Sequence, residues 1–335
     1  MTKKYRLTEG RSNGVRCIDI DMGDLAFTII SDRCMDIGEV KLRGQQVAFL
    51  SKNGIVSPAY YNPRDYGWLE SFGGGLVATC GLQNVGDPCE YNGQHHGLHG
   101  RIGNIPAENI SIEVERDADM YTAQPARVTV TGTVRERAVL GCCYELCRTI
   151  TAQAAEAPNK SSNPQPRDTQ YIITLNDQIT NLSDIPQPLM LLYHINFGYP
   201  MINPGATLTI PGSQSIEPFD KHAEANLKQW MCFTPPSAGA PEEVFLHKFA
   251  PSPDGMGWFS ICSGGHKPMT VNVSYSQDSL PYLGLWKNFR PQEYAMGLEP
   301  CNNHIRGVAL EDANGSLQTL QPNEKTESTI RFHLE

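Results

Sequence analysis

The chain consists largely of short segments in which apolar and polar residues alternate, the period-two pattern of β-strands that bury one face. The first segment, RCIDIDMGDLAFTIIS, carries a Met-Gly-Asp turn at its middle. Most segments are rich in Val, Ile, Thr and Tyr, and clusters of Gly, Pro, Asn and Asp separate them. The expected strands lie at 16–31, 109–116, 126–134, 138–152, 171–182, 188–198, 206–212, 268–276 and 328–334.

Helical patterns are sparse. No segment keeps apolar residues three and four positions apart between helix caps, and short helices are expected only near 63–72 and 222–230. Many strands without intervening helices predict an all-β fold, an antiparallel sandwich or barrel. The polar, Pro-containing stretches 156–168 and 235–243 are expected to be surface loops. We therefore expect one β domain over residues 1–335.

The composition, with 40% hydrophobic and 19% charged residues, is typical of a globular protein. A formal net charge of −9 without clustered Lys and Arg argues against nucleic acid and anionic membranes as partners. No apolar run reaches the roughly 20 residues of a membrane span, and the first residues show no secretory signal. Ten cysteines without a CxxC pair are then expected to be reduced thiols. These features predict a cytoplasmic protein that binds neither nucleic acid nor membrane, and they leave a homo-oligomer open.

Three histidines and an arginine lie among glycines in HHGLHGRIGN, residues 95–104. Glycines on both sides of His99 would let a ligand approach the backbone closely. A metal site made of His95, His96 and His99 is one interpretation, although adjacent side chains of an extended chain point to opposite faces. The zinc-site patterns with HExxH or Cys/His spacing do not occur. Two other interpretations remain open: a structural role for these histidines, and a catalytic or sugar-binding role for His99.

A fourth histidine, His194, lies near the end of the strongly apolar segment LLYHINFGYP. A single histidine among apolar residues is commonly a hydrogen-bonded core residue. The end of a strand also gives rigid support and access to a pocket, so a catalytic role stays open, and Asn196 follows on the same face.

A glutamate, Glu299, lies in YAMGLEPCNN after a short apolar strand, which Pro300 is expected to end. Between Leu298 and Pro300 its carboxylate would be partly desolvated. Desolvation raises the pKa of a carboxyl group and suits it to act as a base. A surface glutamate at the end of a strand is the alternative.

Together, two imidazoles and a carboxylate suggest one chemistry. A base can remove the proton of an anomeric hydroxyl while an acid protonates the ring oxygen, so that a cyclic hemiacetal opens and recloses as the other anomer. Histidine suits the acid because its ordinary pKa is about 6.5. This chemistry needs no metal and no organic cofactor.

The motifs LHGRIG, YHINFG and GLEP resemble, in this order, the Leu-His-Gly-Gly-x-x-Gly loop, the Asn-His-x-x-Phe-Asn segment and the late glutamate motif of galactose mutarotases (aldose 1-epimerases). A divergent branch of aldose-epimerase-like proteins is more similar still, over nearly the whole chain. That resemblance rests on DRCMDIG (32–38), FGGGLVATCGLQNVG (72–86), LHGRIGNIPA (98–107) and GLEPCNN (297–303).

The resemblance implies an antiparallel β-supersandwich with its site on the concave face. It also implies that His194 is the general acid at the ring oxygen, that Glu299 is the base at the anomeric hydroxyl and that His99 binds the sugar. Arg101 follows the His-Gly pair where the family has smaller or different residues. The family's sugar-binding aspartate has only Asp220, in EPFDKH, as a candidate.

Further substrate-binding candidates come from the same motifs and from aromatic positions. We expect Arg33 of DRCMDIG to line the pocket and Asp36 to be structural, and Asn196 to bind substrate beside His194. Trp286 and Lys287 could stack on a sugar face and bind its polar edge. Trp68, Phe72 and glycines 73–75 are weaker candidates of the same kind.

The hypothesis is a sugar mutarotase, a cofactor-independent isomerase whose partner is a monosaccharide or a derivative. A non-catalytic sugar-binding or sugar-sensing domain on the same scaffold is the first alternative. A sugar lyase or another sugar isomerase, metal-dependent through His95, His96 and His99, is the second.

Overall fold

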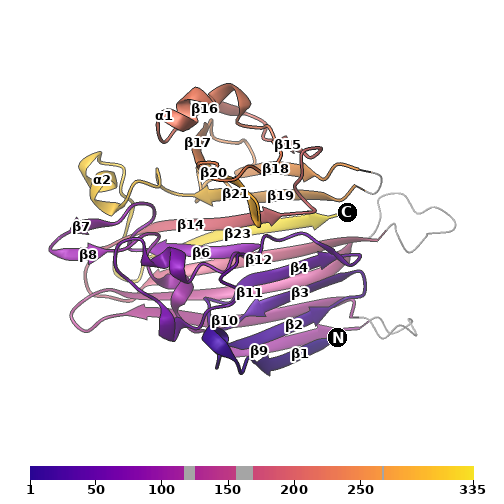
Figure 1. The fold of residues 1–335 in the computed structure, drawn as a ribbon. Coiled ribbons are helices and arrows are strands. Elements are labelled where there is room, and N and C mark those ends of the chain that lie inside the picture. The colour runs from indigo at the N-terminus through magenta and orange to yellow at the C-terminus, as the bar shows by residue number, and fades with distance from the viewer. Residues whose placement is uncertain (117–124, 156–168, 266–267) are drawn as a thin grey trace.

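The computed structural model describes residues 1–116, 125–155, 169–265 and 268–335. Three antiparallel sheets make up most of it, as Figure 1 shows. The all-β prediction is confirmed. The surface loop expected at 156–168 lies outside the described residues.

The largest sheet has eight strands and contains the C-terminal strand of the chain. Its order is β15 (Thr207–Thr209), β18 (Met256–Cys262), β19 (Thr270–Ser276), β23 (Lys325–Leu334), β12 (Gln170–Asn181), β11 (Cys143–Ala155), β10 (Arg127–Arg137) and β9 (Glu108–Glu115).

A six-stranded and a five-stranded sheet face it. The six-stranded order is β16 (Ser213–Pro218), β17 (Glu243–Phe249), β20 (Tyr282–Arg290), β21 (Glu293–Cys301), β14 (Met190–Gly198) and β6 (Val77–Leu82). The five-stranded order is β1 (Thr2–Arg6), β2 (Arg16–Asp21), β3 (Leu25–Ile30), β4 (Asp36–Leu42) and β5 (Gln45–Gln46). Two small pairs complete the sheets: β7 (Cys89–Tyr91) with β8 (Gln94–His96), and β13 (Gln187–Pro188) with β22 (Thr319–Leu320).

Alternating burial explains how these sheets pack. Every second residue of β10 and β19 is buried, and one large hydrophobic cluster joins the inward side chains of all three sheets. Strand β14 differs because all nine of its residues are buried. Its odd-numbered side chains, such as Tyr193, face the eight-stranded sheet, while His194 lies on the opposite face, which other side chains also cover.

Helices are short and lie outside the sheets. The two α-helices are α1 (Lys221–Ala225) and α2 (Val308–Ala313). The 3₁₀ turns are η1 (Gly10–Ser12), η2 (Pro58–Tyr60), η3 (Gly67–Glu70), η4 (Ile102–Asn104) and η6 (Leu227–Gln229). Short helices therefore occur in both regions where the sequence predicts them. Among the described residues no helix has the length and apolar character needed to span a membrane, and all ten cysteines carry free thiols.

The expected end of the strand at Pro300 is wrong. Strand β21 continues to Cys301, and Pro300 lies opposite Leu283 of β20 within the sheet. The pairing with β20 continues through Pro300, whereas the pairing with β14 is interrupted at Glu299 and Pro300 and resumes at Cys301 in the same register.

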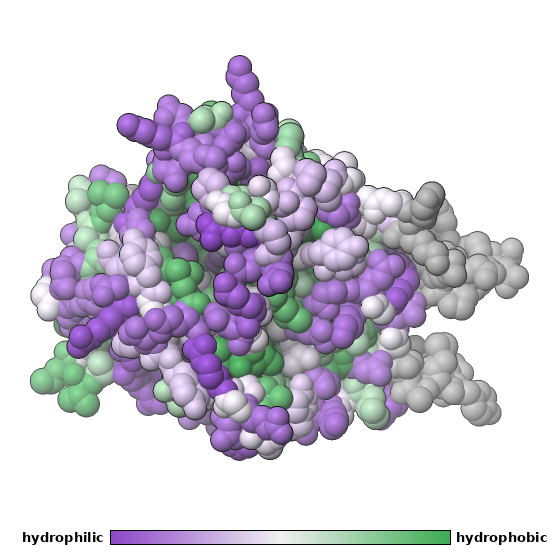
Figure 2. All heavy atoms as spheres, viewed as in Figure 1, coloured by the Kyte–Doolittle hydropathy of each residue, from purple (hydrophilic) through white to green (hydrophobic). Residues whose placement is uncertain are grey.

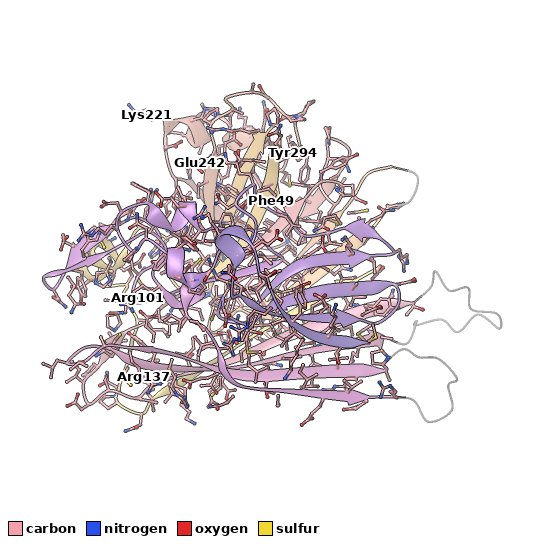
Figure 3. The ribbon with its side chains drawn as sticks, turned by 60° about the horizontal axis from the view of Figure 1, so that its bottom comes forward. Phe49, Arg101, Arg137, Lys221, Glu242 and Tyr294 are labelled. Carbon is pink, nitrogen blue, oxygen red and sulfur yellow. The ribbon has the colours of Figure 1, made fainter. Side chains whose placement is uncertain are left out.

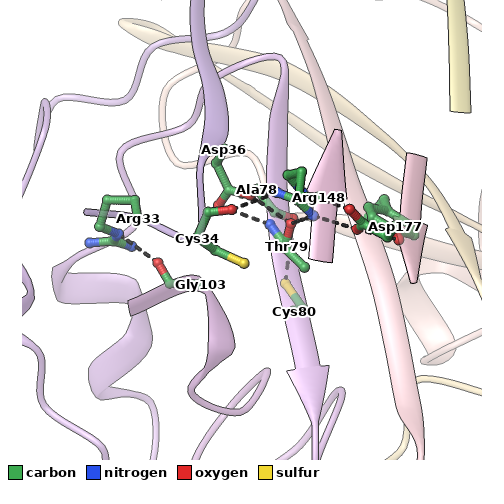
Figure 4. Close-up of polar contacts among 10 residues, drawn as sticks. Arg33, Cys34, Asp36, Ala78, Thr79, Cys80, Gly103, Arg148 and Asp177 are labelled. Atoms are coloured by element: carbon green, nitrogen blue, oxygen red, sulfur yellow. Dashed lines mark hydrogen bonds and ion pairs between the residues drawn. The ribbon is translucent and has the colours of Figure 1, made fainter. Parts of the chain in front are cut away.

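A buried polar network crosses the core between the layers, and Figure 4 shows it. Arg148 of β11 makes a two-pronged ion pair with Asp177 of β12, at 2.8 and 2.7 Å. Its Nη1 donates to Asp36 of β4 at 2.9 Å, and its Nη2 donates to Thr79 of β6 at 2.8 Å. Tyr193 of β14 donates to Asp177 at 2.7 Å. The network therefore ties all three sheets together, and Asp36 has the structural role that the sequence favours.

Candidate active site

A cavity of about 340 Å³ lies on the outer face of the six-stranded sheet. This volume is at the small end of the range for sites that bind small organic molecules. In Figure 2 this side of the molecule is mainly hydrophilic, with hydrophobic residues visible in its recesses. We call this space the His194 cavity. Its lining residues are Tyr66, Trp68, Leu69, Phe72, Gly86, Asp87, Leu98, His99, His194, Phe219, Asp220, Glu242, Val244, Trp286, Glu299, Ile305 and Arg306.

Strands β14 and β21 bring His194 and Glu299 into contact. Their register pairs Ile195 with Leu298, so the neighbouring His194 and Glu299 fall directly opposite each other. Nε2 of His194 lies 3.1 Å from Oε1 of Glu299. The approach is not aligned for a hydrogen bond, and Oε1 has no hydrogen-bond partner among the described residues. Oε1 is therefore a fully buried carboxyl oxygen without a partner in the described part of the chain, on a side chain that lines the cavity.

An aromatic shell surrounds the pair. The ring of His194 lies 6.1 Å from Trp68, 5.2 Å from Phe72 and 5.4 Å from Trp286, between ring centroids. His194 is 5% exposed and Glu299 is 3% exposed. The rings displace water from both groups while the cavity keeps them open to a ligand.

Burial shifts the pKa values of His194 and Glu299 so that the uncharged form of each group is favoured. Desolvation lowers the pKa of His194 to about 3, with His99 as a second cause. Desolvation raises the pKa of Glu299 to about 8, and the negative charge of Glu242 adds to the rise. At neutral pH the empty site therefore favours a neutral imidazole beside a protonated carboxyl group, so the pair holds one exchangeable acid proton.

The backbone orients His99 toward the same cavity. Its residue adopts a left-handed conformation, φ 57°, just before Gly100 at φ 68°. The amide of Gly86 donates to Nδ1 of His99 at 3.3 Å, which leaves the ring proton on Nε2 as a donor. The ring packs edge-on against Trp68 at 4.7 Å, and burial lowers the pKa of His99 to about 4. His99 is therefore a neutral hydrogen-bond donor.

The mouth of the cavity carries charged and aromatic groups. Asp220 caps α1 with Oδ1, which accepts from the backbone at 2.8 Å. Trp286 donates from Nε1 to Glu242 at 2.9 Å. Arg306 stacks on the ring of Phe219 at 3.6 Å and donates to its carbonyl. Of the predicted substrate-binding residues, His99, Asp220 and Trp286 thus share this cavity with the two predicted catalytic residues.

Arg33 is not among the residues that line this cavity, and Figure 4 shows its contact with Gly103. Its Nε donates to the carbonyl of Gly103 at 2.8 Å, and Nη1 donates to the carbonyls of Val56 and Ser71, both at 3.1 Å. It does not pair with Asp36, which Arg148 holds. Arg33 lines a different cavity, behind Phe72.

Three more predicted residues also lie outside the lining of the His194 cavity. Arg101 is half exposed, with Nε 3.9 Å from Glu136, and Figure 3 shows it on a different part of the surface from Glu242. Asn196 is buried beside His194 and donates to its carbonyl at 2.7 Å. Lys287 follows Trp286, so strand alternation turns it to the other face, where Nζ lies 2.6 Å from a carboxylate oxygen of Glu243.

The other histidines of the glycine-rich motif face away from His99. Nδ1 of His95 lies 2.9 Å from Glu90. His95 and His96 line a second recess with Arg101 and Glu136. Within the described ranges, no group of three or more His, Cys, Asp or Glu side chains is arranged to hold a metal ion.

Several lining residues escaped the sequence analysis. Phe219, Glu242 and Arg306 come from loops or loop ends of ordinary composition, and no motif marks them. Asp220, in EPFDKH, was the one sequence candidate on the side of the cavity that these residues form. Its neighbour Phe219 could have been inferred from it.

A family model described as a domain of unknown function, DUF4432, matches residues 12–334. No protein with curated annotation matches the chain. Among solved structures, a Klebsiella pneumoniae protein described as a putative aldose 1-epimerase is 25% identical, with a TM-score of 0.86 over 99% of this chain and 83% of that one. A galactose mutarotase-like protein of Clostridium acetobutylicum is 16% identical, with a TM-score of 0.64 over 100% and 98% of the two chains.

The galactose 1-epimerase of Lactobacillus acidophilus is 13% identical, with a TM-score of 0.55 over 100% of this chain and 98% of that one. At these low sequence identities, the structural similarity establishes a shared fold. The predicted supersandwich is confirmed. The chain belongs to the DUF4432 family, and it has the fold of the galactose mutarotase-like (aldose 1-epimerase) proteins.

Proposed function

We propose that the protein is a sugar mutarotase, an aldose 1-epimerase-type isomerase that interconverts α and β anomers without a metal or organic cofactor. The observation that carries the proposal is the 3.1 Å contact between His194 and Glu299 inside a small cavity that His99 also lines. The fold that the chain shares with a putative aldose 1-epimerase and a galactose mutarotase-like protein supports the same activity.

In the proposed mechanism His194 and Glu299 act on the two oxygens attached to the anomeric carbon. The resting proton lies on Glu299. It passes across the 3.1 Å separation to His194 once the two groups turn into hydrogen-bond alignment and sugar hydroxyls stabilise the charged pair. Glu299 then removes the proton of the anomeric hydroxyl while His194 protonates the ring oxygen, and the C–O bond to the ring breaks.

Reclosure reverses both transfers after the exposed carbonyl has rotated. Glu299 returns its proton to the carbonyl oxygen, and His194 takes the proton of the attacking hydroxyl. The pair therefore begins and ends each turnover with one proton, so no net acid or base is consumed. The Nε2–H group of His99 donates a hydrogen bond to the bound sugar, and Trp286 offers a ring face for its C–H surface.

The test is anomer exchange, followed by NMR on neutral, deoxy and acidic sugars. The wild-type protein should accelerate exchange for at least one of them. Glu299→Gln should remove most of the acceleration while the fold and sugar binding persist, because only the base is lost. His194→Asn should behave in the same way.

His95→Asn is the matched control, because His95 lies outside the cavity and is the same residue type. It should keep the wild-type rate. Sugar binding without any acceleration by the wild-type protein would instead identify a sugar-sensing domain. Unfolding of the Glu299→Gln protein would make Glu299 structural.

A further inference from the structure

A second cavity, of about 250 Å³, lies on the other side of Phe72. Strands of the five-stranded sheet supply Tyr5 and Ile30, and the loop after β5 supplies Ile55 and Val56. The glycine run 73–75 forms another part of the wall. We call this space the Arg33 cavity. Only Phe72 lines both it and the His194 cavity.

Arg33 in this cavity has donors to spare. A guanidinium has five N–H groups, and the three carbonyl bonds of Arg33 use Nε and Nη1 alone. Nη2 has no hydrogen-bond partner among the described residues, and it is not among their fully buried unpaired atoms, so it is open to the cavity.

Arg33 also has no ion-pair partner among the described residues, although the negative charge of Asp36 acts on it from a longer distance. No carboxylate of the described residues lies within ion-pair distance of it, in contrast to Arg148, which contacts two. Glu39, at the edge of the cavity, pairs with Lys41 at 2.9 Å. A cation held by neutral carbonyls in a largely desolvated position is costly, and an anion placed against it relieves that cost.

The other polar side chains of the cavity are committed. Tyr5 and Thr28 both donate to Asp19, at 3.1 and 2.7 Å. Ser71 donates to the carbonyl of Trp68 at 3.2 Å. Asp36 also lines the cavity, and its carboxylate accepts from Thr79 and Arg148. Apart from these groups and Glu39 the wall is aliphatic, aromatic or glycine, so Arg33 is the donor that the cavity offers to an otherwise apolar ligand.

We propose that the Arg33 cavity binds a small monocarboxylate with a compact apolar body, separately from the sugar. The carboxylate takes the free donors of Arg33, and the apolar body packs on Ile30, Ile55 and Phe72. The volume equals that of about eight water molecules at about 30 Å³ each, which suits an acid of benzoate size. Because the ring of Phe72 stacks on Trp68 at 4.5 Å, the ligand would contact the wall of the His194 cavity from behind.

Titration calorimetry with benzoate, benzamide and benzyl alcohol tests this proposal and does not depend on any enzyme activity. Benzoate should bind at one site per chain. Benzamide and benzyl alcohol should bind at least about tenfold more weakly, about 1.4 kcal/mol, because both lack the charge. Arg33→Gln should weaken benzoate binding to the level of benzamide.

Arg33 also joins three backbone segments, so its substitution could lower stability. Ile55→Trp therefore fills the cavity while Arg33 is kept, and it should abolish benzoate binding in a protein whose melting curve is unchanged. His95→Asn, remote from the cavity, should bind as the wild type does. No benzoate binding at millimolar concentration, equal binding of benzamide, or unchanged binding by Ile55→Trp would overturn the proposal.

Discussion

Two glycines make room for the contact between His194 and Glu299. A Cβ atom at Gly297 would lie 2.5 Å from Oε1 of Glu299 and 2.9 Å from Cε1 of His194. A Cβ at Gly284 would lie 3.0 Å from Oε2 of the same carboxyl group. Gly297 lies opposite Trp286 in β20, so the missing side chain also lets that ring approach. The contact between His194 and Glu299 therefore requires residues without a side chain at positions 284 and 297.

Gly297→Ala should displace the carboxyl group of Glu299 and lower the rate of anomer exchange at least about tenfold, if one hydrogen bond of the transition state is lost. Overpacking should also cost about 1–3 kcal/mol of unfolding free energy. The checks are the NMR exchange rate and urea unfolding. Gly257→Ala is the control, because its Cβ would lie 2.4 Å from the ring of Tyr275 in the eight-stranded sheet. It should lose stability and keep its rate; equal rate losses in both variants would contradict the argument.

Glu299 should also make stability depend on pH. Its pKa is about 8 in the folded protein and about 4.3 in the unfolded chain, so the folded state binds more protons between these values. The contribution of Glu299 to the unfolding free energy is therefore greatest below about pH 4. It decreases as the pH rises and is lost once the pH has passed 8. Glu299→Gln removes the loss, so it should be more stable than the wild type at pH 9, by about 1.4 kcal/mol per unit of pKa difference.

The advantage of Glu299→Gln should shrink as the pH falls toward 5. The histidines shift in the opposite sense: the pKa values of His99 and His194 are lowered, so both proteins lose stability as the pH falls below about 6.5. That effect cancels in the difference between the two proteins. Denaturant unfolding of both from pH 5 to 9 measures it, and a difference independent of pH would show that Glu299 is ionised in the fold.

Sequence reasoning reached the residues that carry the chemistry but not all of their surroundings. The raised pKa of Glu299 was expected from Leu298 and Pro300, yet the desolvation involves rings that are more than 200 residues away, at Trp68 and Phe72. Arg33 was expected in the sugar pocket because arginine binds anions. Its three carbonyl partners come from separate loops, and no local pattern encodes such a contact.

At the scale of elements, the N-terminus of helix α1 lies at the mouth of the His194 cavity. Asp220 caps this five-residue helix and also lines the cavity. Asp220→Ala should lower the unfolding free energy by about 1 kcal/mol because the cap is lost, whereas Asp220→Asn keeps a capping oxygen and should preserve stability. Thermal unfolding of the two variants and the wild type checks this prediction about stability.

Sugar affinity separates the two roles of Asp220. If its charge contributes to binding, Asp220→Asn should bind the preferred sugar of the exchange assay more weakly than the wild type, at unchanged stability. Equal affinity of the two proteins would confine Asp220 to capping.

Most of the strands that were predicted alternate, such as β10, β12 and β19. Strands β20 and β21 were not delimited in advance, although they hold Trp286 and Glu299. Seven consecutive residues at the end of β21 are buried because the core covers one face and the His194 cavity the other. A strand covered on both faces loses the period-two signal, and β21 was not delimited for this reason. Strand β14 is also buried throughout, but its long apolar run still marked it at 188–198.

At the scale of the whole molecule, the order of the strands supports our proposal that residues 1–335 form one domain. Strand β23, the last of the chain, pairs with both β12 and β19 inside the eight-stranded sheet. It thereby joins strands from the middle of the chain to strands from its last third. The core cluster likewise extends from Ile18 to Leu334. One cooperative unfolding transition is expected from such a connection.

Arg148 lies where the three sheets meet, so its substitution tests that cooperativity. Arg148→Met would leave the carboxylates of Asp36 and Asp177 buried without their partner, which should cost about 3–5 kcal/mol of unfolding free energy. Adding Asp36→Asn and Asp177→Asn to the same chain should recover part of the loss, because the unpaired charges are then gone. Urea unfolding followed by fluorescence and by far-ultraviolet circular dichroism should give coincident single transitions for every variant. If the two probes separate in Arg148→Met, the sheets unfold independently and the network is the bond between two domains rather than the centre of one.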